Sequence, residues 1–379
     1  MRPARLLPAA ATLLTVAALL CGCPPAPPAA IAAPTGVAAV RADLDALLAA
    51  GAVGAVATLS DGPATVTLAA GVADTATGAP IPTDPAPYVR VGSITKTFTA
   101  AILAQLSDEG VVHLDAPVDT YLQGLLRGAG VDGRAITVRQ LLRHRSGLPE
   151  FADDPAMDEY QAGREHRTVT PDQEIAAALL HPAKFAPDAR YDYTNTNYIV
   201  AGMLIERLTG HPYAQELHRR ILAPAALIHT YLPAAGELTL RPPHPHGYTS
   251  EHPPREVSAV EPSIPWSAGA LVSTGADLNR FYTALLAGKI VAPQPLREML
   301  DGRPTDAATT FYGLGLGYTT LPCGVRYVGH TGGISGFLTL SGATERGRAV
   351  TLTMTGLPDQ AVAAGRVDPV ALLTHALCP

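Results

Sequence analysis

Ser93 and Lys96 have the spacing of a nucleophile and its base. They lie three residues apart in the run Ser93-Ile94-Thr95-Lys96, which opens a predicted helix, so their side chains share one face. A serine hydroxyl needs a base, and a lysine can serve when burial lowers its pKa. The pattern is short and often accidental when it stands alone. It nevertheless predicts that Ser93 is the nucleophile of an acyl-enzyme hydrolase.

Lysine is rare in this chain, whereas arginine is common. Lysine occurs at positions 96, 184 and 289 and nowhere else. Arginine cannot give up its proton in a protein, but lysine can. The choice of lysine at position 96 therefore favours a proton-accepting role there.

Tyr193-Thr194-Asn195 precedes a second predicted helix. The Tyr193 hydroxyl could carry a proton to and from Ser93, and the Asn195 amide could fix Lys96 and the substrate. Alternatively, Thr194 or Asn195 is simply the N-cap of the helix. Taken alone, the segment favours the cap.

His330-Thr331-Gly332 ends a predicted strand and continues into Gly333. The two glycines leave a bare strand edge along which a substrate backbone could lie. The alternative is an ordinary strand that runs into a glycine turn. At its usual pKa, His330 would be mostly neutral at pH 7, so we expect anionic substrates to bind better as the pH falls towards 6.

The three segments together, in this order, resemble the serine penicillin-binding and class C β-lactamase superfamily. The resemblance is closest to the secreted D-alanyl-D-alanine carboxypeptidases of actinobacteria and runs from about Val37 to the end of the chain. Supporting segments are 136–144, 146–148, 193–210 and 266–270.

The resemblance implies a role for each matching residue. Ser93 would attack the carbonyl of a D-Ala-D-Ala peptide or a β-lactam, and Lys96 and Tyr193 would move its proton. Backbone N–H groups would form the oxyanion hole. The residues that would bind substrate are Asn195, His330, Thr331, Gly332, Gly333 and Trp266. Among these, Thr331 would contact the substrate carboxylate and Trp266 would wall the cleft.

Two departures leave the substrate open. Gly333 stands where these carboxypeptidases often have a hydroxyl, and no arginine clearly matches their carboxylate-binding one, since Arg326 lies four residues before His330. A D-Ala-D-Ala carboxypeptidase that penicillins acylate is the main expectation. The alternatives are a β-lactamase, an esterase or amidase for another D-amino-acid compound, and a penicillin-binding sensor that does not turn over.

The order of predicted elements indicates an α+β fold, a three-layer α/β/α sandwich. Strands predicted near both ends would form one mainly antiparallel sheet with helices on both faces. We expect one catalytic unit over residues 36–379, with its α/β part at about 36–110 and 262–379. The remainder, about 111–261, would be a mostly helical insertion that includes a helix over 114–126.

The N-terminal 35 residues predict export. Arg2 and Arg5 precede the apolar stretch 6–20, which is typical of a signal peptide, and a Pro/Ala-rich linker follows. Two processing routes are open: lipidation at Cys23, which would anchor the protein to the outer face of the cytoplasmic membrane, or cleavage near Ala32, which would release it.

Two cysteines, Cys323 and Cys378, follow the predicted signal. In an exported chain two such thiols favour a disulfide, although two unrelated buried cysteines are the alternative. Their spacing also resembles the disulfide of the carboxypeptidase group. The net charge is −6 and there is no Lys/Arg-rich run, so we expect no nucleic-acid partner. No motif predicts a metal or cofactor.

Overall fold

One antiparallel sheet contains strands from both the N-terminal and the C-terminal part of the described chain. The computed structural model describes residues 33–307, 309–358, 361 and 365–378. The strand order in the sheet is β3-β2-β1-β13-β12-β11-β10-β9-β8. The strands are β1 (Gly54–Asp61), β2 (Ala64–Asp74), β3 (Ala79–Pro80), β8 (Arg303–Pro304), β9 (Phe311–Tyr312), β10 (Gly317–Thr320), β11 (Arg326–Ile334), β12 (Phe337–Thr344) and β13 (Arg348–Thr355). The N-terminal strand β1 therefore pairs directly with the late strand β13, from Gly54 opposite Thr355 to Asp61 opposite Arg348.

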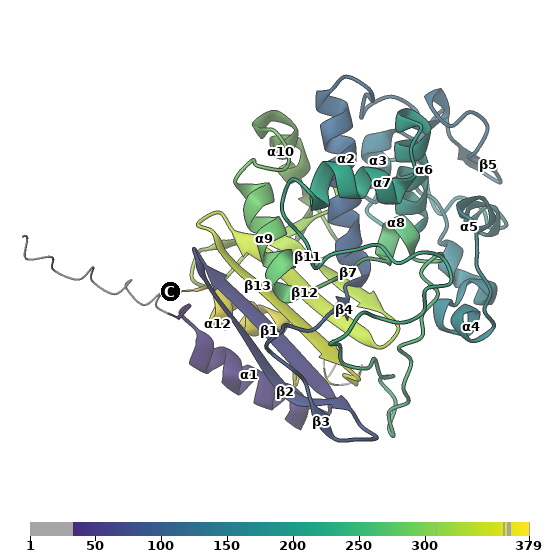
Figure 1. The fold of residues 1–379 in the computed structure, drawn as a ribbon. Coiled ribbons are helices and arrows are strands. Elements are labelled where there is room, and N and C mark those ends of the chain that lie inside the picture. Colours follow the sequence, from purple (N-terminus) through teal and green to yellow (C-terminus); the bar gives the residue numbers. More distant parts are fainter. Residues whose placement is uncertain (1–32, 308, 359–360, 362–364, 379) are drawn as a thin grey trace, which may run out of the picture. The chain divides into compact units, whose positions relative to one another are not determined.

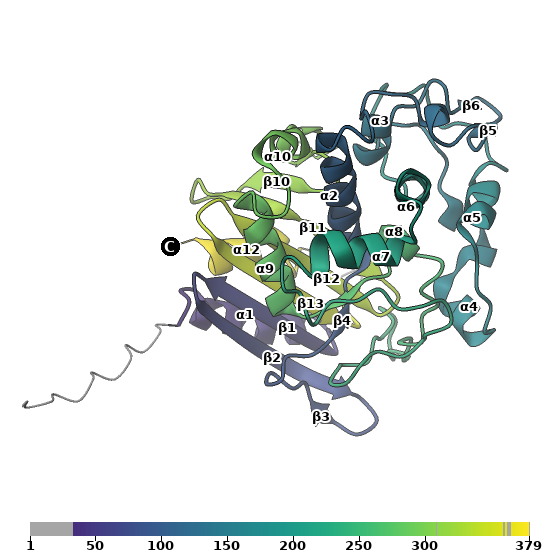
Figure 2. The same cartoon turned by 45° about the horizontal axis from the view of Figure 1, so that its top comes forward.

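Helices cover both faces of this sheet (Figures 1 and 2). Helices α1 (Val37–Ala49) and α12 (Pro369–Leu377) share one apolar cluster with the sheet. Helices α2 (Thr95–Asp108) and α9 (Gly275–Leu286) lie on the opposite face in a larger cluster. The arrangement confirms the predicted α+β sandwich, because alternating strand residues bury apolar side chains against a helical layer on each side.

Further helices lie around α2 and beyond it. They are α3 (Val138–Leu142), α4 (Glu159–Arg164), α5 (Pro171–Ala178), α6 (Thr196–Thr209), α7 (Tyr213–Leu217), α8 (Trp266–Gly269) and α10 (Pro293–Leu300). Two small pairs of strands lie outside the main sheet: β4 (Val89–Arg90) with β7 (Val272–Ser273), and β5 (Arg127–Gly128) with β6 (Val131–Asp132). The β4–β7 pair leads the chain into α2 and so helps to place Ser93.

The predicted helix over 114–126 is wrong. The segment contains a single 3₁₀ turn, Val118–Thr120, preceded by Pro117. The side chain of Asp119 accepts a hydrogen bond from the N–H of Gly124, which itself adopts a left-handed φ of 76°. These local bonds hold the segment as turns instead of helix.

Residues 1–32 lie outside the described part of the chain. The proposed signal peptide, the lipidation site Cys23 and the cleavage site near Ala32 all fall there. Within the described residues, the helices are too short or too polar to cross a bilayer.

Candidate active site

Lys96 is fully buried and its amine contacts Ser93 directly. Ser93 lies in the 3₁₀ turn Gly92–Ile94, which opens α2. The Nζ of Lys96 lies 2.9 Å from Oγ of Ser93, 2.7 Å from Oδ1 of Asn195 and 2.9 Å from the carbonyl oxygen of Ala268. Three segments distant in sequence thus meet at one amine.

Burial lowers the pKa of Lys96 to about 7, and the negative charge of Glu150 acts in the opposite direction. A neutral amine has two N–H groups and one lone pair. The Asn195 and Ala268 oxygens can only accept, so they take the two hydrogens and leave the lone pair facing the Ser93 hydroxyl. This arrangement suits a base that removes the Ser93 proton.

The Tyr193 ring lies next to this amine, with its centroid 4.9 Å from Nζ of Lys96. Burial raises the pKa of the Tyr193 phenol, while the nearby Ser93 hydroxyl acts against that rise. The hydroxyl is buried and forms no hydrogen bond of ordinary geometry with the residues that the structure describes. Such a group is available to a substrate atom or to Ser93 itself.

Glu150 holds Asn195 in place, and nothing in the sequence pointed to it. One oxygen of its carboxylate accepts hydrogen bonds from the backbone N–H of Asn195 at 2.7 Å and from Nδ2 at 3.2 Å. Because Nδ2 is used in this way, Oδ1 must face Lys96. Asn195 therefore contacts Lys96, as the sequence suggested.

Glycines allow β11 to approach Ser93. A Cβ on Gly332 would lie 1.9 Å from the carbonyl oxygen of Val91, and a Cβ on Gly92 would lie 2.7 Å from the carbonyl oxygen of Gly333. Gly92 also has a left-handed φ of 53°. A Cβ on Gly333 itself would meet open space. The close contact between strand and turn thus requires glycine at 92 and 332, and brings the backbone of Gly333 beside the backbone of Ser93.

A buried chain of polar side chains supports His330. The Tyr312 hydroxyl lies 2.9 Å from Nε2 of His330 and 3.3 Å from Nε2 of His144. Nδ1 of His330 contacts the carbonyl oxygen of Thr331, and Nδ1 of His144 lies 3.2 Å from the N–H of Thr194. One proton assignment satisfies every bond: His144 donates to Tyr312, Tyr312 to His330, and His330 to Thr331. Both imidazoles are then neutral.

The structure corrects the expected titration of His330. Burial and, to a smaller extent, the positive charge of Lys96 lower its pKa to about 3. His330 therefore stays neutral between pH 6 and 7, and the predicted gain in binding of anionic substrates towards pH 6 loses its cause. The sequence-based expectation used the pKa of a solvated imidazole, and burial removes that condition.

The cavity beside Ser93 is about 140 Å³ in volume. We call it the acyl cavity. Ser93, Asn195 and Gly333 line it together with the apolar side chains of Phe151, Met157, Ile264, Pro265 and Ile334. It also contains a carboxylate, that of Glu159, whose Oε1 accepts hydrogen bonds from the N–H and Oγ of Ser335 at 3.3 and 2.8 Å.

The expected wall residue Trp266 does not line the acyl cavity. Its ring packs edge-on against Tyr213, with centroids 5.5 Å apart, and contacts α6 near Gly202. Pro265, Ala268 and Gly269 from the same segment face the cavity instead. The backbone of Trp266 has a left-handed φ of 26°.

A second pocket, of about 320 Å³, lies along β11 at His330 and Thr331. We call it the tyrosine pocket, because its lining includes Tyr191, Tyr193, Tyr312, Tyr318 and Tyr327. Thr331 is exposed there. The reacting residues are thus divided between two pockets: Ser93 lines the acyl cavity and Tyr193 lines the tyrosine pocket.

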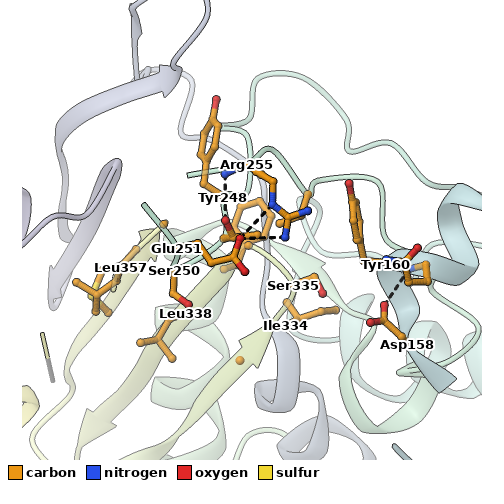
Figure 3. Close-up of a pocket in the computed structure, with 18 residues that line it drawn as sticks. Asp158, Tyr160, Tyr248, Ser250, Glu251, Arg255, Ile334, Ser335, Leu338 and Leu357 are labelled. Atoms are coloured by element: carbon orange, nitrogen blue, oxygen red, sulfur yellow. Dashed lines mark hydrogen bonds and ion pairs between the residues drawn. The ribbon is translucent and has the colours of Figure 1, made fainter. Parts of the chain in front are cut away.

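A third, open groove begins where the acyl cavity ends (Figure 3). Gly333 and Ile334 line both. Figure 3 shows the pair formed by Arg255 and Glu251 on one wall of this outer groove and Tyr160 near Asp158 on the other. The outer groove gives a long acyl group a place to continue.

Cys323 and Cys378 form a disulfide with a Cα–Cα distance of 6.1 Å. It joins the turn before β11 to the end of α12. In the described residues, no group of three or more His, Cys, Asp or Glu side chains is placed to hold a metal ion.

Comparison with known proteins identifies the family. Residues 40–372 match the beta-lactamase family. A D-stereospecific amidohydrolase from Streptomyces sp. is 36% identical, with a TM-score of 0.80 over 90% of this chain and 98% of that one. A D-amino acid amidase from Ochrobactrum anthropi SV3, complexed with L-phenylalanine amide, is 28% identical, with a TM-score of 0.77 over 89% of this chain and 97% of that one.

Penicillin-binding protein 4* from Bacillus subtilis (strain 168) is 26% identical over 265 residues, which are 66% of this chain and 56% of that protein. The chain thus spans little more than half the length of this curated relative. The family match covers most of the chain, and the structure has the same fold as the two amide hydrolases. The chain therefore belongs to the beta-lactamase family and is a serine hydrolase of the superfamily that includes the penicillin-binding proteins.

Proposed function

We propose that this protein hydrolyses the amide bond on the carbonyl side of a D-amino acid residue through an acyl-enzyme on Ser93. The observation that carries the proposal is the amine of Lys96, which has its two acceptor oxygens in place and its lone pair directed at Ser93. The similarity to a D-stereospecific amidohydrolase and a D-amino acid amidase supports the choice of bond and configuration.

The reaction begins with transfer of the Ser93 proton to neutral Lys96 while Oγ attacks the substrate carbonyl carbon. The backbone N–H groups of Ser93 and Gly333 stabilise the oxyanion. Tyr193 gives its proton to the leaving nitrogen and regains one from Lys96, so the amine departs neutral. Water then attacks the ester on Ser93, and its proton returns to the serine oxygen by the reverse route.

The acyl cavity suits a D-aminoacyl group with a free amine and an apolar side chain. Phe151, Met157 and Ile264 offer an apolar surface. One oxygen of Glu159 is fixed by Ser335, and the carboxylate can pair with an ammonium group. A carboxylate in the acyl cavity supports amino acid amides as substrates.

The D-Ala-D-Ala carboxypeptidase reaction is the second candidate. Relatives named as penicillin-binding proteins favour it. It requires a leaving group that carries a carboxylate, and the residues that line the tyrosine pocket include no lysine or arginine. Arg326 lies over the ring of Tyr318 at 3.9 Å and is not among the lining residues. This charge pattern makes the amidase reaction the first choice.

Mass spectrometry of the acyl-enzyme tests the proposal. The protein would be incubated with D-phenylalanine amide, its L enantiomer and a fluorescent penicillin, and the adduct mass and product release would be followed over time. We expect an adduct on Ser93 and release of ammonia from the D amide. Ser93→Ala should abolish both, whereas Ser107→Ala, at the other end of α2, should not. A folded protein that forms no adduct and releases no product from either amide would refute the proposal.

Export belongs to the proposal as well. It is supported by the two arginines and the apolar stretch 6–20. Metabolic labelling with a fatty acid would show whether Cys23 carries a lipid. Label in the wild type that Cys23→Ala removes would establish the anchor, and secretion without label would establish the released form.

A further inference from the structure

The tyrosine pocket lies where the leaving group must be. Tyr193 gives its proton to the leaving nitrogen in the proposed reaction, and Tyr193 lines the tyrosine pocket. Ser93 and Asn195 line the acyl cavity. Whatever is attached to the leaving nitrogen therefore extends into the tyrosine pocket.

The pocket offers a carboxylate no positive partner. Lysine and arginine are absent from its described lining, and the lining includes Asp306. Burial raises the pKa of the Tyr191 phenol, and the negative charge of Asp306 raises it further. His330 is held neutral, since Nε2 accepts from Tyr312 and Nδ1 contacts the carbonyl oxygen of Thr331. A buried carboxylate without a partner is strongly disfavoured.

Arg326, which directly precedes the lining residue Tyr327, is already engaged elsewhere. The guanidinium of Arg326 stacks on Tyr318 at 3.9 Å and lies 3.5 Å from Oε1 of Glu345. Another of its nitrogens lies 3.5 Å from the carbonyl oxygen of Leu300. With these contacts in place, Arg326 is not among the residues that line the tyrosine pocket.

The walls suit an aromatic or apolar group. The Tyr191 and Tyr312 rings lie 5.7 Å apart in a tilted arrangement, and Tyr318 is stacked on Phe311 at 5.2 Å. The hydroxyl of Tyr193, a lining residue, is buried and forms no hydrogen bond of ordinary geometry with the described residues. An unpaired buried hydroxyl costs about 1–3 kcal/mol, so a ligand that carries a polar atom beside an apolar body would bind well here.

We propose that the tyrosine pocket is a leaving-group subsite that selects uncharged aromatic or apolar amines and excludes carboxylates. This inference rests on the proposed function. It means that the enzyme releases substituted amines from D-aminoacyl amides and discriminates against free C-terminal D-amino acids.

Substrates with one acyl group and different leaving groups test the subsite. D-Phenylalanine benzylamide and D-phenylalanine amide have leaving nitrogens of similar basicity, and differ in the aromatic ring that would enter the pocket. We expect kcat/KM about tenfold higher for the benzylamide, because burial of an aromatic ring is worth 1.5–3 kcal/mol. D-Phe-D-alaninamide should likewise exceed D-Phe-D-Ala by about tenfold or more, because only the latter carries a carboxylate.

A charge variant provides a gain-of-function test. Thr319 lines the tyrosine pocket, whereas its neighbour Thr320 is exposed outside it. Thr319→Arg should raise the ratio of kcat/KM for D-Phe-D-Ala to that for D-Phe-D-alaninamide about fivefold or more. Thr320→Arg adds the same charge and should leave the ratio as in the wild type.

The outcomes separate the two proposals. Equal kcat/KM for D-Phe-D-Ala and its amide in the wild type, with D-phenylalanine amide cleaved, would overturn the subsite and leave the proposed function standing. Failure to cleave any D-phenylalanyl amide would overturn both. The wild-type comparison stands even if Thr319→Arg does not fold.

Discussion

Lys96 and Asn195 are 99 residues apart in the chain and are joined by a hydrogen bond of 2.7 Å. The bond has a fixed direction, because Glu150 occupies the Nδ2 side of the Asn195 amide. The position of the catalytic amine thus depends on a carboxylate that does not contact it through a hydrogen bond. Glu150 is a positioning residue, and its charge also acts on Lys96.

Glu150→Gln should shift the pH dependence of the reaction. Glu150 raises the pKa of Lys96, so its neutralisation should lower that pKa. A base works in its neutral form, so kcat/KM rises with pH through about 7 in the wild type. We expect the midpoint of this rise, the acid limb of the pH profile, to move to lower pH by about half a unit. We also expect kcat to fall, because Asn195 loses its fixed orientation. Glu165→Gln, an exposed control that pairs with Arg167, should leave the limb in place.

Lys96→Met should change how stability depends on pH. The folded pKa of Lys96 is about 7 and the usual value is 10.5, so between these values the unfolded chain binds the extra proton. The free energy of unfolding therefore rises with pH across that window, by up to about 1.4 kcal/mol per pH unit. Urea denaturation at several pH values should show this slope in the wild type and its loss in the variant. Lys289→Met should retain it, and an identical slope in Lys96→Met would contradict the burial argument.

Gly332→Ala and Gly333→Ala form a matched pair. A methyl group at 332 would collide with the backbone of Val91, whereas at 333 it would meet open space. We expect the first change to destabilise the fold by about 2 kcal/mol or more and to reduce kcat about a hundredfold as the strand moves away from Ser93. The second should fold normally. Equal thermal stability and equal kcat for the two variants would show that the close contact is not needed.

Tyr312→Phe should break the chain that joins the two buried histidines. Each imidazole loses the partner of its Nε2, and one unpaired buried group costs about 1–3 kcal/mol. KM should rise more than kcat falls, because Thr331 on the substrate-facing strand loses its support. Tyr282→Phe removes a single buried hydroxyl bonded to Thr97 and serves as the control. It should lower stability less and leave KM unchanged.

Cys378→Ser should destabilise the protein without removing its activity. The disulfide closes a sequence separation of 55 residues, and such bridges typically contribute about 2–4 kcal/mol. It lies at the end of α12, among the residues of the apolar cluster on the face opposite α2. Thermal unfolding with and without reductant should show the loss in the wild type and no further loss in the variant. A large fall in kcat below the melting temperature would contradict this separation of roles.

The elements with a periodic apolar pattern and the short motifs could be recognised in the sequence. Helix α1 and strands β11 to β13 could be predicted, because alternating and helical patterns of apolar residues are read directly from the chain. The order of the predicted strands and helices indicated the fold class, and the order of the Ser93, Tyr193 and His330 segments indicated the family.

Residues that belong to no motif were beyond such a prediction. Glu150 and Glu159 lie in no repeating pattern, and only the folded chain brings them to Asn195 and Ser335. The buried state of His330 was equally hidden, because only the folded chain encloses its imidazole and places Lys96 and Tyr312 near it. Trp266 was expected in the wall of the cleft and does not line the acyl cavity, because the sequence does not show in which direction a side chain points.

The sheet that carries the site has a consequence for synthesis. Strand β1 pairs with β13, and the turn that holds Ser93 lies against β11, so part of the surroundings of the nucleophile comes from residues more than two hundred positions later. On a ribosome, α2 emerges long before β11 to β13 do. Until the last third of the chain has been synthesised, the apolar helix α2 and the N-terminal half of the sheet therefore remain uncovered. No acyl-enzyme can form on a nascent chain, and a truncated chain should be recognised by chaperones and proteases long before any substrate.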